Sequence, residues 1–184
     1  MSSQLLNQEE ANQFILECHF DLDTIKEKLE EKPELIKSYN PETIESALGA
    51  SGHMGREDIA EFLLSKGAEI ELATAAMLGR RDLIAEALKQ DPANARVGGA
   101  HNIPIAFHAA LSGDVELMQM LWDAGAQEDT KGSLLGAVMK NRIAMARWLL
   151  DHGASKDVKR FDGKSPLQLA QEMGFSEIAA LLTS

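Results

Sequence analysis

The feature that most constrains the fold is a short phrase that occurs three times in the chain. Residues 62–68 read FLLSKGA, residues 120–126 read MLWDAGA and residues 148–154 read WLLDHGA. In each copy the apolar end of a predicted helix is followed by Gly-Ala, and glycine just past a helix can adopt the left-handed conformation that ends it. A helix that ends in the same way at intervals along the chain predicts a stack of similar helical units.

Short turns divide these units. The predicted turn residues are Phe20, Gly55, Gly79, Gly113, Asn141 and Gly174. After each turn comes a helix with apolar residues at three- and four-residue intervals, such as Ile59, Phe62 and Leu63. Shorter helices rich in small residues are predicted before the later turns, over 46–52, 72–78, 105–112, 133–140 and 167–173. Each unit is therefore a helical hairpin that buries its apolar face only by stacking on its neighbours.

Composition excludes several classes of function. The net charge of −11 disfavours binding to nucleic acid or to an anionic membrane surface, so we expect neither as a partner. The single cysteine, Cys18, allows no internal disulfide and fits a reducing compartment. The first ten residues lack the features of a signal peptide, and no apolar run is long enough to cross a membrane. We expect a cytoplasmic protein.

The last unit gives a specific resemblance. Residues 162–170 read DGKSPLQLA, which resembles the ankyrin signature Asp-x-x-Gly-x-Thr-Pro-Leu-His-x-Ala-Ala, one residue shorter and with Ser for Thr and Gln for His. Residues 113–126 resemble the second half of the same repeat, and residues 21–36 resemble a first ankyrin unit. The resemblance implies an all-α, ankyrin-like solenoid of stacked helix-turn-helix repeats in a single domain, 1–184. The predicted units are roughly 8–39, 40–70, 71–98, 99–128, 129–158 and 159–184.

The joins between units depart from the family pattern. Residues 69–71 and 127–132 are too short for the β-hairpin finger that normally links ankyrin units. The joins at 32–42, 91–104 and 153–165 are long enough for one. The sequence therefore predicts irregular fingers, some of them missing.

Motifs for chemistry are weak. Residues 49–53 (GASGH) resemble a serine nucleophile elbow but end in His and lie in a predicted helix rather than after a strand. Gly163-Lys164-Ser165 lacks the upstream glycine of a phosphate-binding loop. No two of the five histidines have the i, i+4 spacing of a helical metal site, and each is interpreted as a satisfied or solvated side chain. We predict no enzyme activity, no cofactor and no metal site.

The ankyrin resemblance implies a protein-binding surface on the concave side, formed by finger tips and the exposed ends of the first helices. The predicted contact residues are His53, Met54, Met77, Leu78, Arg96, His101, Asn102, Leu111, Ser112, Met139, Lys140, Arg160, Phe161 and Lys164. A groove bearing Met would suit an apolar or helical segment of a partner. Three alternatives stay open: some of the Met and Leu side chains belong to the core, Phe161 packs beneath its finger, and residues 96–102 form only a flexible turn.

Three classes of function follow. The first is a monomeric, non-catalytic scaffold that binds a protein partner through this concave side. The second is an accessory subunit of a permanent complex or homodimer, with Trp148 and Phe175 at a convex or terminal interface. The third, an enzyme or metal-dependent protein, requires His or acidic side chains from different units to converge.

Overall fold

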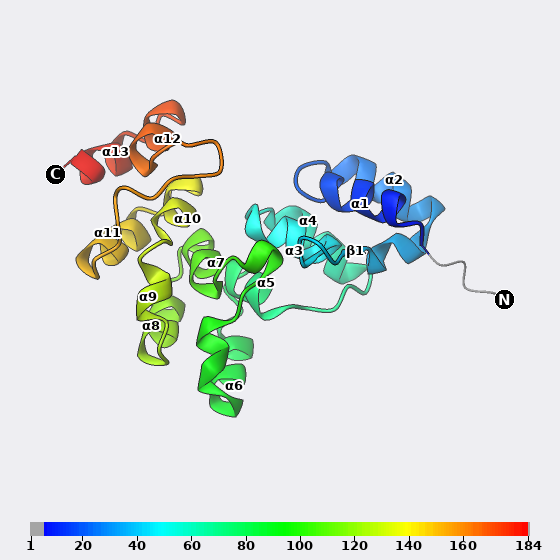
Figure 1. Cartoon of the computed structure of the whole chain (residues 1–184), viewed down its shortest axis with the longest axis horizontal. Helices are drawn as coiled ribbons and strands as arrows, with labels where there is room; N and C mark the ends of the chain where they lie inside the picture. The colour runs from blue at the N-terminus through cyan, green and yellow to red at the C-terminus, as the bar shows by residue number, and fades with distance from the viewer. Residues whose placement is uncertain (1–5, 184) are drawn as a thin grey trace.

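A computed structural model describes residues 6–183 as a row of helical hairpins (Figure 1). The helices are α1 (Gln8–Glu17), α2 (Leu22–Glu31), α3 (Ala47–His53), α4 (Glu57–Ser65), α5 (Leu72–Met77), α6 (Arg81–Gln90), α7 (Ile105–Ser112), α8 (Val115–Asp123), α9 (Gln127–Thr130), α10 (Leu134–Met139), α11 (Ile143–Asp151), α12 (Pro166–Glu172) and α13 (Ser176–Thr183). Three short 3-10 helices, η1 (Pro33–Lys37), η2 (Pro92–Arg96) and η3 (Ala100–Asn102), lie in the longer joins. The N-terminal pair lies at one end of the row and the C-terminal pair at the other.

The first helices of the hairpins form an inner row. Helix α3 packs on α5, α5 on α7, α7 on α10 and α10 on α12. The second helices α6 and α8 project away from this row (Figure 1). Small residues allow the close approach: a side chain at Gly136 would place its Cβ 2.8 Å from the Phe107 carbonyl oxygen. The buried core therefore consists mainly of Ala, Leu, Ile and Met side chains between successive hairpins.

The predicted turns have the expected backbone. Gly55, Gly79, Gly113 and Gly174 all have positive φ, and Asn141 takes the same conformation with φ of 52°. Asn is one of the few non-glycine residues that tolerate this region. Phe20, by contrast, is not among the residues of positive φ, so the first turn is built differently from the others.

The fingers are irregular. Strand β1 (Tyr39–Asn40) pairs antiparallel with β2 (Glu45–Ser46), and the second long join has only one isolated bridge, between Gly98 and Pro104. The short helix α9 replaces a finger at 127–130, and residues 69–71 connect two hairpins directly. The prediction of an all-α solenoid with partly missing fingers is confirmed. The residue boundaries of its units stay a prediction.

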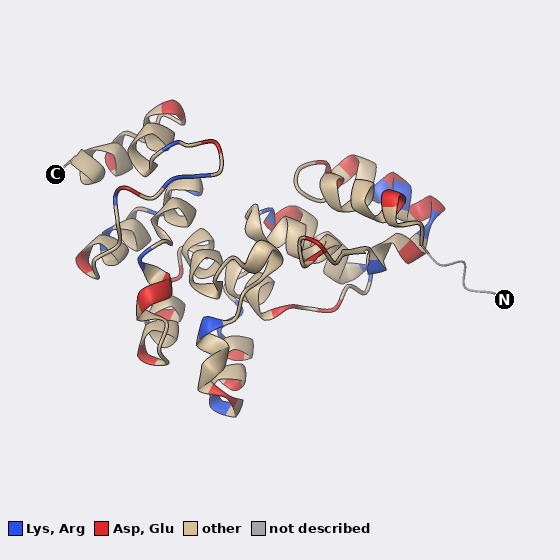
Figure 2. Ribbon diagram, viewed as in Figure 1, with Lys and Arg blue, Asp and Glu red and all other residues tan. Residues whose placement is uncertain are grey.

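Charge is unevenly distributed over the ribbon. Asp and Glu occur on most helices, whereas Lys156, Lys159, Arg160 and Lys164 gather on the join before α12 (Figure 2). None of the helices within residues 6–183 combines the length and apolar character that a membrane crossing requires.

Candidate functional site: the two edges of the stack

The predicted groove of Met and Leu at the ends of the inner helices is closed. Met77 and Leu111 are each only 1% exposed and belong to an apolar cluster with Ile59 and Leu63. The prediction that these two side chains are available to a partner is wrong. Leu78 and Met139 are partly buried against the same cluster, and Met54 and Ser112 are half-buried.

The cause lies at what we call the turn edge, formed by the turns at Gly55, Gly79, Gly113 and Asn141. The Lys140 ammonium donates a hydrogen bond to the Gly55 carbonyl oxygen at 2.7 Å, although 85 positions separate the two residues. The Arg142 guanidinium donates to the Leu111 carbonyl oxygen at 3.0 Å and pairs with Glu57 at 3.0 Å. The turn after α10 therefore reaches the turn after α3, and the helix ends between them become core.

The opposite side, which we call the finger edge, carries the joins at 32–46, 91–104 and 153–165. Arg96 is exposed there and lies 3.3 Å from the Asp129 carboxylate. Asn102 is exposed and has φ of 56°. These two predicted contact residues are therefore on the surface.

The last finger presents Phe161 to solvent. Its side chain is 91% exposed, so it does not pack beneath the finger. The Arg160 guanidinium lies 5.2 Å from the centre of the Phe161 ring and also pairs with Asp162, which holds the pKa of that carboxyl well below its usual value. Lys164 pairs with Glu172 of α12 at 2.5 Å. The finger is thus braced by ion pairs, while its aromatic side chain stays exposed to solvent beside Arg160.

His53 and His101, predicted as separate contact residues, come together at the finger edge. Nitrogen atoms of three imidazoles surround one buried carboxylate oxygen, Oε1 of Glu45. The distances to this oxygen are 3.3 Å from His19 Nε2, 3.4 Å from His53 Nδ1 and 3.3 Å from His101 Nε2. The four ligand atoms all lie within 4.8 Å of one another. We call His19, Glu45, His53 and His101 the histidine cluster.

The pKa values of the cluster residues are shifted in different directions. Burial opposes the charged form of His19, but the Glu45 carboxylate and the Ile15 and Leu16 carbonyls outweigh it and raise the pKa of His19. Burial, followed by the charge on His19, lowers the pKa of His53 to about 4. Burial also opposes the ionised form of Glu45, but the surrounding histidines lower the pKa of its carboxyl. The surroundings therefore favour an ionised Glu45 and a neutral His53, and they favour the charged form of His19 more than water does.

Spacing rules could not find this cluster, because its members come from four separate places in the chain. His19 follows α1, Glu45 lies in β2, His53 ends α3 and His101 lies in η3. The turn that holds His101 reaches the first finger because residues 69–71 form no finger between them, and the His101 amide donates to the Thr43 carbonyl oxygen at 2.8 Å. The convergence that the third functional class requires is thus present in the fold.

The remaining histidines have other surroundings. His108 is 1% exposed beneath the 98–104 join, and burial lowers its pKa to about 4. His152 stacks on Trp148 with ring centres 3.7 Å apart. Cys18 is buried, and burial raises the pKa of its thiol far above the usual value, so it has the character of a core residue.

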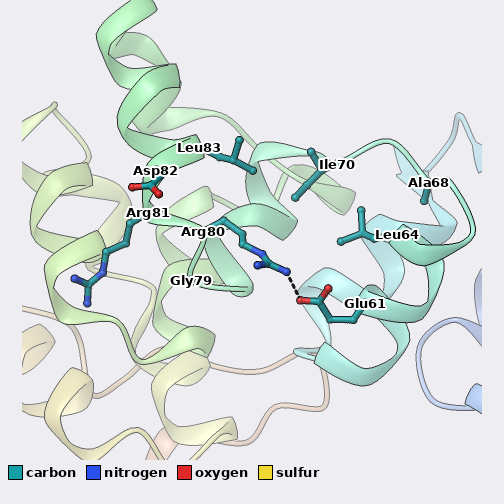
Figure 3. A pocket seen from close by; sticks show the side chains of 9 residues that line it. All are labelled: Glu61, Leu64, Ala68, Ile70, Gly79, Arg80, Arg81, Asp82 and Leu83. Atoms are coloured by element: carbon teal, nitrogen blue, oxygen red, sulfur yellow. Dashed lines mark hydrogen bonds and ion pairs between the residues drawn. The ribbon is translucent and has the colours of Figure 1, made fainter.

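A groove on the convex side lies between α4 and α6. It has a volume of about 810 Å³ and is lined by Leu64, Ile70 and Leu83, with the Arg80–Glu61 ion pair across it (Figure 3). Ile70 and Leu83 are 42% and 45% exposed. Ile70, which belongs to the direct connection at 69–71, is one of the residues that line the groove.

Comparison with known proteins identifies the repeats. A family model described as "Ankyrin repeats (3 copies)" matches residues 106–184. Residues 106–184 of this chain are ankyrin repeats. YahD of Escherichia coli (strain K12), described as an ankyrin repeat protein, is 46% identical over 54 residues, and that match spans 27% of each chain. The family prediction is confirmed.

The fold of this chain also occurs in a solved complex. A chain in the structure of the predatory endopeptidase Bd0816 from Bdellovibrio bacteriovorus with immunity protein Bd3460 is similar to it, with a TM-score of 0.52 and 21% identity. The alignment covers 92% of this chain and 96% of that one. At this identity the likeness concerns the fold alone. Ankyrin repeats indicate a protein-interaction scaffold, and such domains are typically non-catalytic binding modules.

Proposed function

We propose that this ankyrin-repeat protein is a scaffold that binds a protein partner along its finger edge, with Phe161 as the anchor. The observation that carries the proposal is the 91% exposure of this aromatic side chain at the tip of a braced finger. Aromatic and Arg side chains dominate the energy of protein interfaces. A finger already held by ion pairs loses little conformational entropy when a partner binds.

The rest of the finger edge supports the same surface. Tyr39 and Ile44 of the first finger are 47% and 46% exposed, and Arg96 and Asn102 are exposed between the two fingers. The turn edge is the weaker choice, because its Met and Leu side chains are buried. The similar chain comes from a complex of an endopeptidase with an immunity protein, which favours a folded protein as the partner class.

Affinity capture from lysate of the source cell tests this function, with the native protein and a Phe161→Ala variant as baits. A protein that the native bait retains and the folded Phe161→Ala bait loses supports the finger edge. Leu83→Ala is the matched control, because it removes an exposed apolar side chain from the convex groove. If Leu83→Ala loses the partner and Phe161→Ala keeps it, the finger edge is wrong.

That reversed result would favour the second candidate, an accessory subunit buried through its convex face. The specific observation behind it is the groove with exposed Ile70 and Leu83. Trp148 and Phe175, the two interface residues considered from the sequence, are both half-buried, and Trp148 lies against Trp122 with ring centres 5.6 Å apart. Size-exclusion chromatography separates the two candidates further, since we expect the scaffold to be a monomer.

A further inference from the structure

The histidine cluster matches part of a tetrahedral metal site: the three edges at Glu45 Oε1 have the expected length, and all four ligand atoms lie within 4.8 Å of one another. With bonds of about 2.0–2.1 Å to His nitrogen and carboxylate oxygen, the ligands of a tetrahedral zinc ion lie about 3.3–3.4 Å apart. The three distances from imidazole nitrogen to Glu45 Oε1 are 3.3, 3.4 and 3.3 Å. Three edges of the expected tetrahedron are therefore already present.

The central carboxylate oxygen lacks a conventional partner. Glu45 is 4% exposed, and among the described residues none makes a hydrogen bond of acceptable geometry to its Oε1 atom. Buried carboxylate oxygens without such a partner are costly, and native proteins rarely keep them. The three nitrogens lie around this oxygen, but none has the N–H direction of a hydrogen bond to it. Ligands that share one cation are expected to have this arrangement.

A backbone contact orients His19 as a ligand, whereas His53 Nδ1 lies 3.2 Å from the Gly49 carbonyl oxygen, a contact that an ion bound to this nitrogen would replace. His19 Nδ1 lies 2.9 Å from the Ile15 carbonyl oxygen, which can only accept a hydrogen bond. The proton of a neutral His19 is therefore on Nδ1, and the Nε2 lone pair faces the cluster. Such a backbone contact behind a ligating imidazole is the usual support for a metal site.

His101 is held in place by its backbone. Its amide donates to the Thr43 carbonyl oxygen, and both His101 and Ile44, the neighbour of Glu45, have positive φ, at 56° and 54°. Non-glycine residues persist in this conformation where the surrounding structure enforces it, commonly at functional sites. The His101 side chain is 43% exposed, against 12–13% for the other two imidazoles, and offers an ion a path from solvent.

We infer that the histidine cluster binds one divalent transition-metal ion, with zinc as the preferred ion. Three imidazole nitrogens and one carboxylate oxygen suit zinc, and four protein ligands leave no coordination position for water or substrate. The site is therefore structural: the ion would clamp the first finger and the turn before α7 onto the end of α3. This role is independent of the partner proposed above.

Metal titration of the full chain tests the inference. The purified protein is stripped with EDTA, dialysed and titrated with Zn²⁺ by isothermal calorimetry, and its metal content is measured by mass spectrometry. We expect one zinc ion per chain and, at a hundredfold excess over Kd, a rise in Tm of about 5 °C or more. Co²⁺ in place of Zn²⁺ should give the intense visible absorption of tetrahedral coordination.

Variants then locate the site. His101→Asn removes an exposed ligand while keeping a residue that tolerates the left-handed backbone, and Glu45→Gln keeps the shape of the central side chain. Each should weaken zinc binding at least tenfold while circular dichroism shows a native fold. His152→Asn is the matched control, because it removes a histidine outside the cluster, and it should bind zinc as the native chain does.

Two results would overturn the inference. One is a folded native chain that neither binds zinc in the calorimeter nor retains it after dialysis. The other is equal zinc affinity in the native, Glu45→Gln and His101→Asn chains, which would place any bound ion elsewhere. If the native chain binds Co²⁺ with octahedral coordination, the site is not four-coordinate, and its assignment as a structural site is wrong.

Discussion

The two edges of the stack both connect hairpins that are not neighbours in sequence, but they do so with different chemistry. At the turn edge, cationic donors meet carbonyl acceptors: Lys140 binds the Gly55 carbonyl, and Arg142 binds the Leu111 carbonyl. At the finger edge, three imidazoles face one carboxylate oxygen to which no residue in the described part of the chain donates a hydrogen bond. The turn edge is complete as it stands, whereas the finger edge is the edge where we propose a bound ion and where aromatic side chains are exposed. The turn edge is closed, and we propose that the finger edge is the one that binds.

The largest predicted effect is a fall in the free energy of unfolding at low pH. It comes from His108, which is buried beneath the 98–104 join at the finger edge. Its pKa is about 4 in the folded chain and about 6.5 when unfolded, so the unfolded state binds more protons between these values. The stability contributed by neutral His108 is present above pH 6.5 and is lost as pH falls towards 4. We expect a loss on the order of 3 kcal/mol in the free energy of unfolding.

Urea unfolding at a series of pH values measures this effect. His108→Gln removes the titrating group, so the difference between the native and variant curves isolates His108 from His19 and His53, which titrate in both chains. Parallel curves for the two proteins between pH 7 and pH 4 would contradict the prediction.

The turn edge depends on close approach of α7 and α10, and Gly136→Ala should break it. The added Cβ would lie 2.8 Å from the Phe107 carbonyl oxygen and 3.2 Å from the Ala110 Cβ, both on a packed helix. Overpacking of this kind outweighs the better helix propensity of Ala, and we expect the free energy of unfolding to fall by about 2 kcal/mol. Gly132→Ala is the control because nothing lies within 4 Å of its added Cβ, and equal losses in the two variants would exclude this explanation.

Loss of either arginine contact, that of Arg142 or that of Arg80, should lower the free energy of unfolding by less than Gly136→Ala does. Arg142→Met keeps much of the side-chain stem but leaves the Leu111 carbonyl oxygen without its donor, which should cost about 1 kcal/mol. Arg80→Met removes a more exposed pair with Glu61 and should change stability by less than about 0.5 kcal/mol. Thermal unfolding of both variants under one condition gives the comparison. A larger loss from Arg80→Met would show that the turn edge is not closed by Arg142.

Phe161→Ala should have the smallest effect on stability. Because its side chain is 91% exposed, we expect a change within about 0.5 kcal/mol in the free energy of unfolding. Partner capture should nevertheless be lost, as proposed above. A marked drop in Tm would instead mean that this side chain contributes to packing and is not free for a partner.

The sequence predicted the repeat and its turns because these depend on local signals. Glycine or Asn after a short helix specifies positive φ, and apolar spacing specifies the buried face of the second helices. The missing fingers were likewise evident from the length of residues 69–71 and 127–132.

The contacts across the stack were not predictable in the same way. Whether Met77 is exposed depends on how far the hairpins curl, and that is set by Lys140 reaching a carbonyl 85 positions away. His19 and His101 likewise have no sequence relation that would indicate a shared site. Such contacts follow from the accumulated rotation of several hairpins, which no local pattern contains.

The direct connection at 69–71 has a consequence for how the chain unfolds. Ordinary repeat arrays have interactions only between nearest neighbours, so they can lose structure one repeat at a time from either end. Here α3 contacts α7 directly, and the turn after α3 is bonded to the turn after α10. Residues 47–151 should therefore melt in a single cooperative transition, while α12 and α13 can fray independently. Omission of one finger has turned part of a linear array into a globular unit.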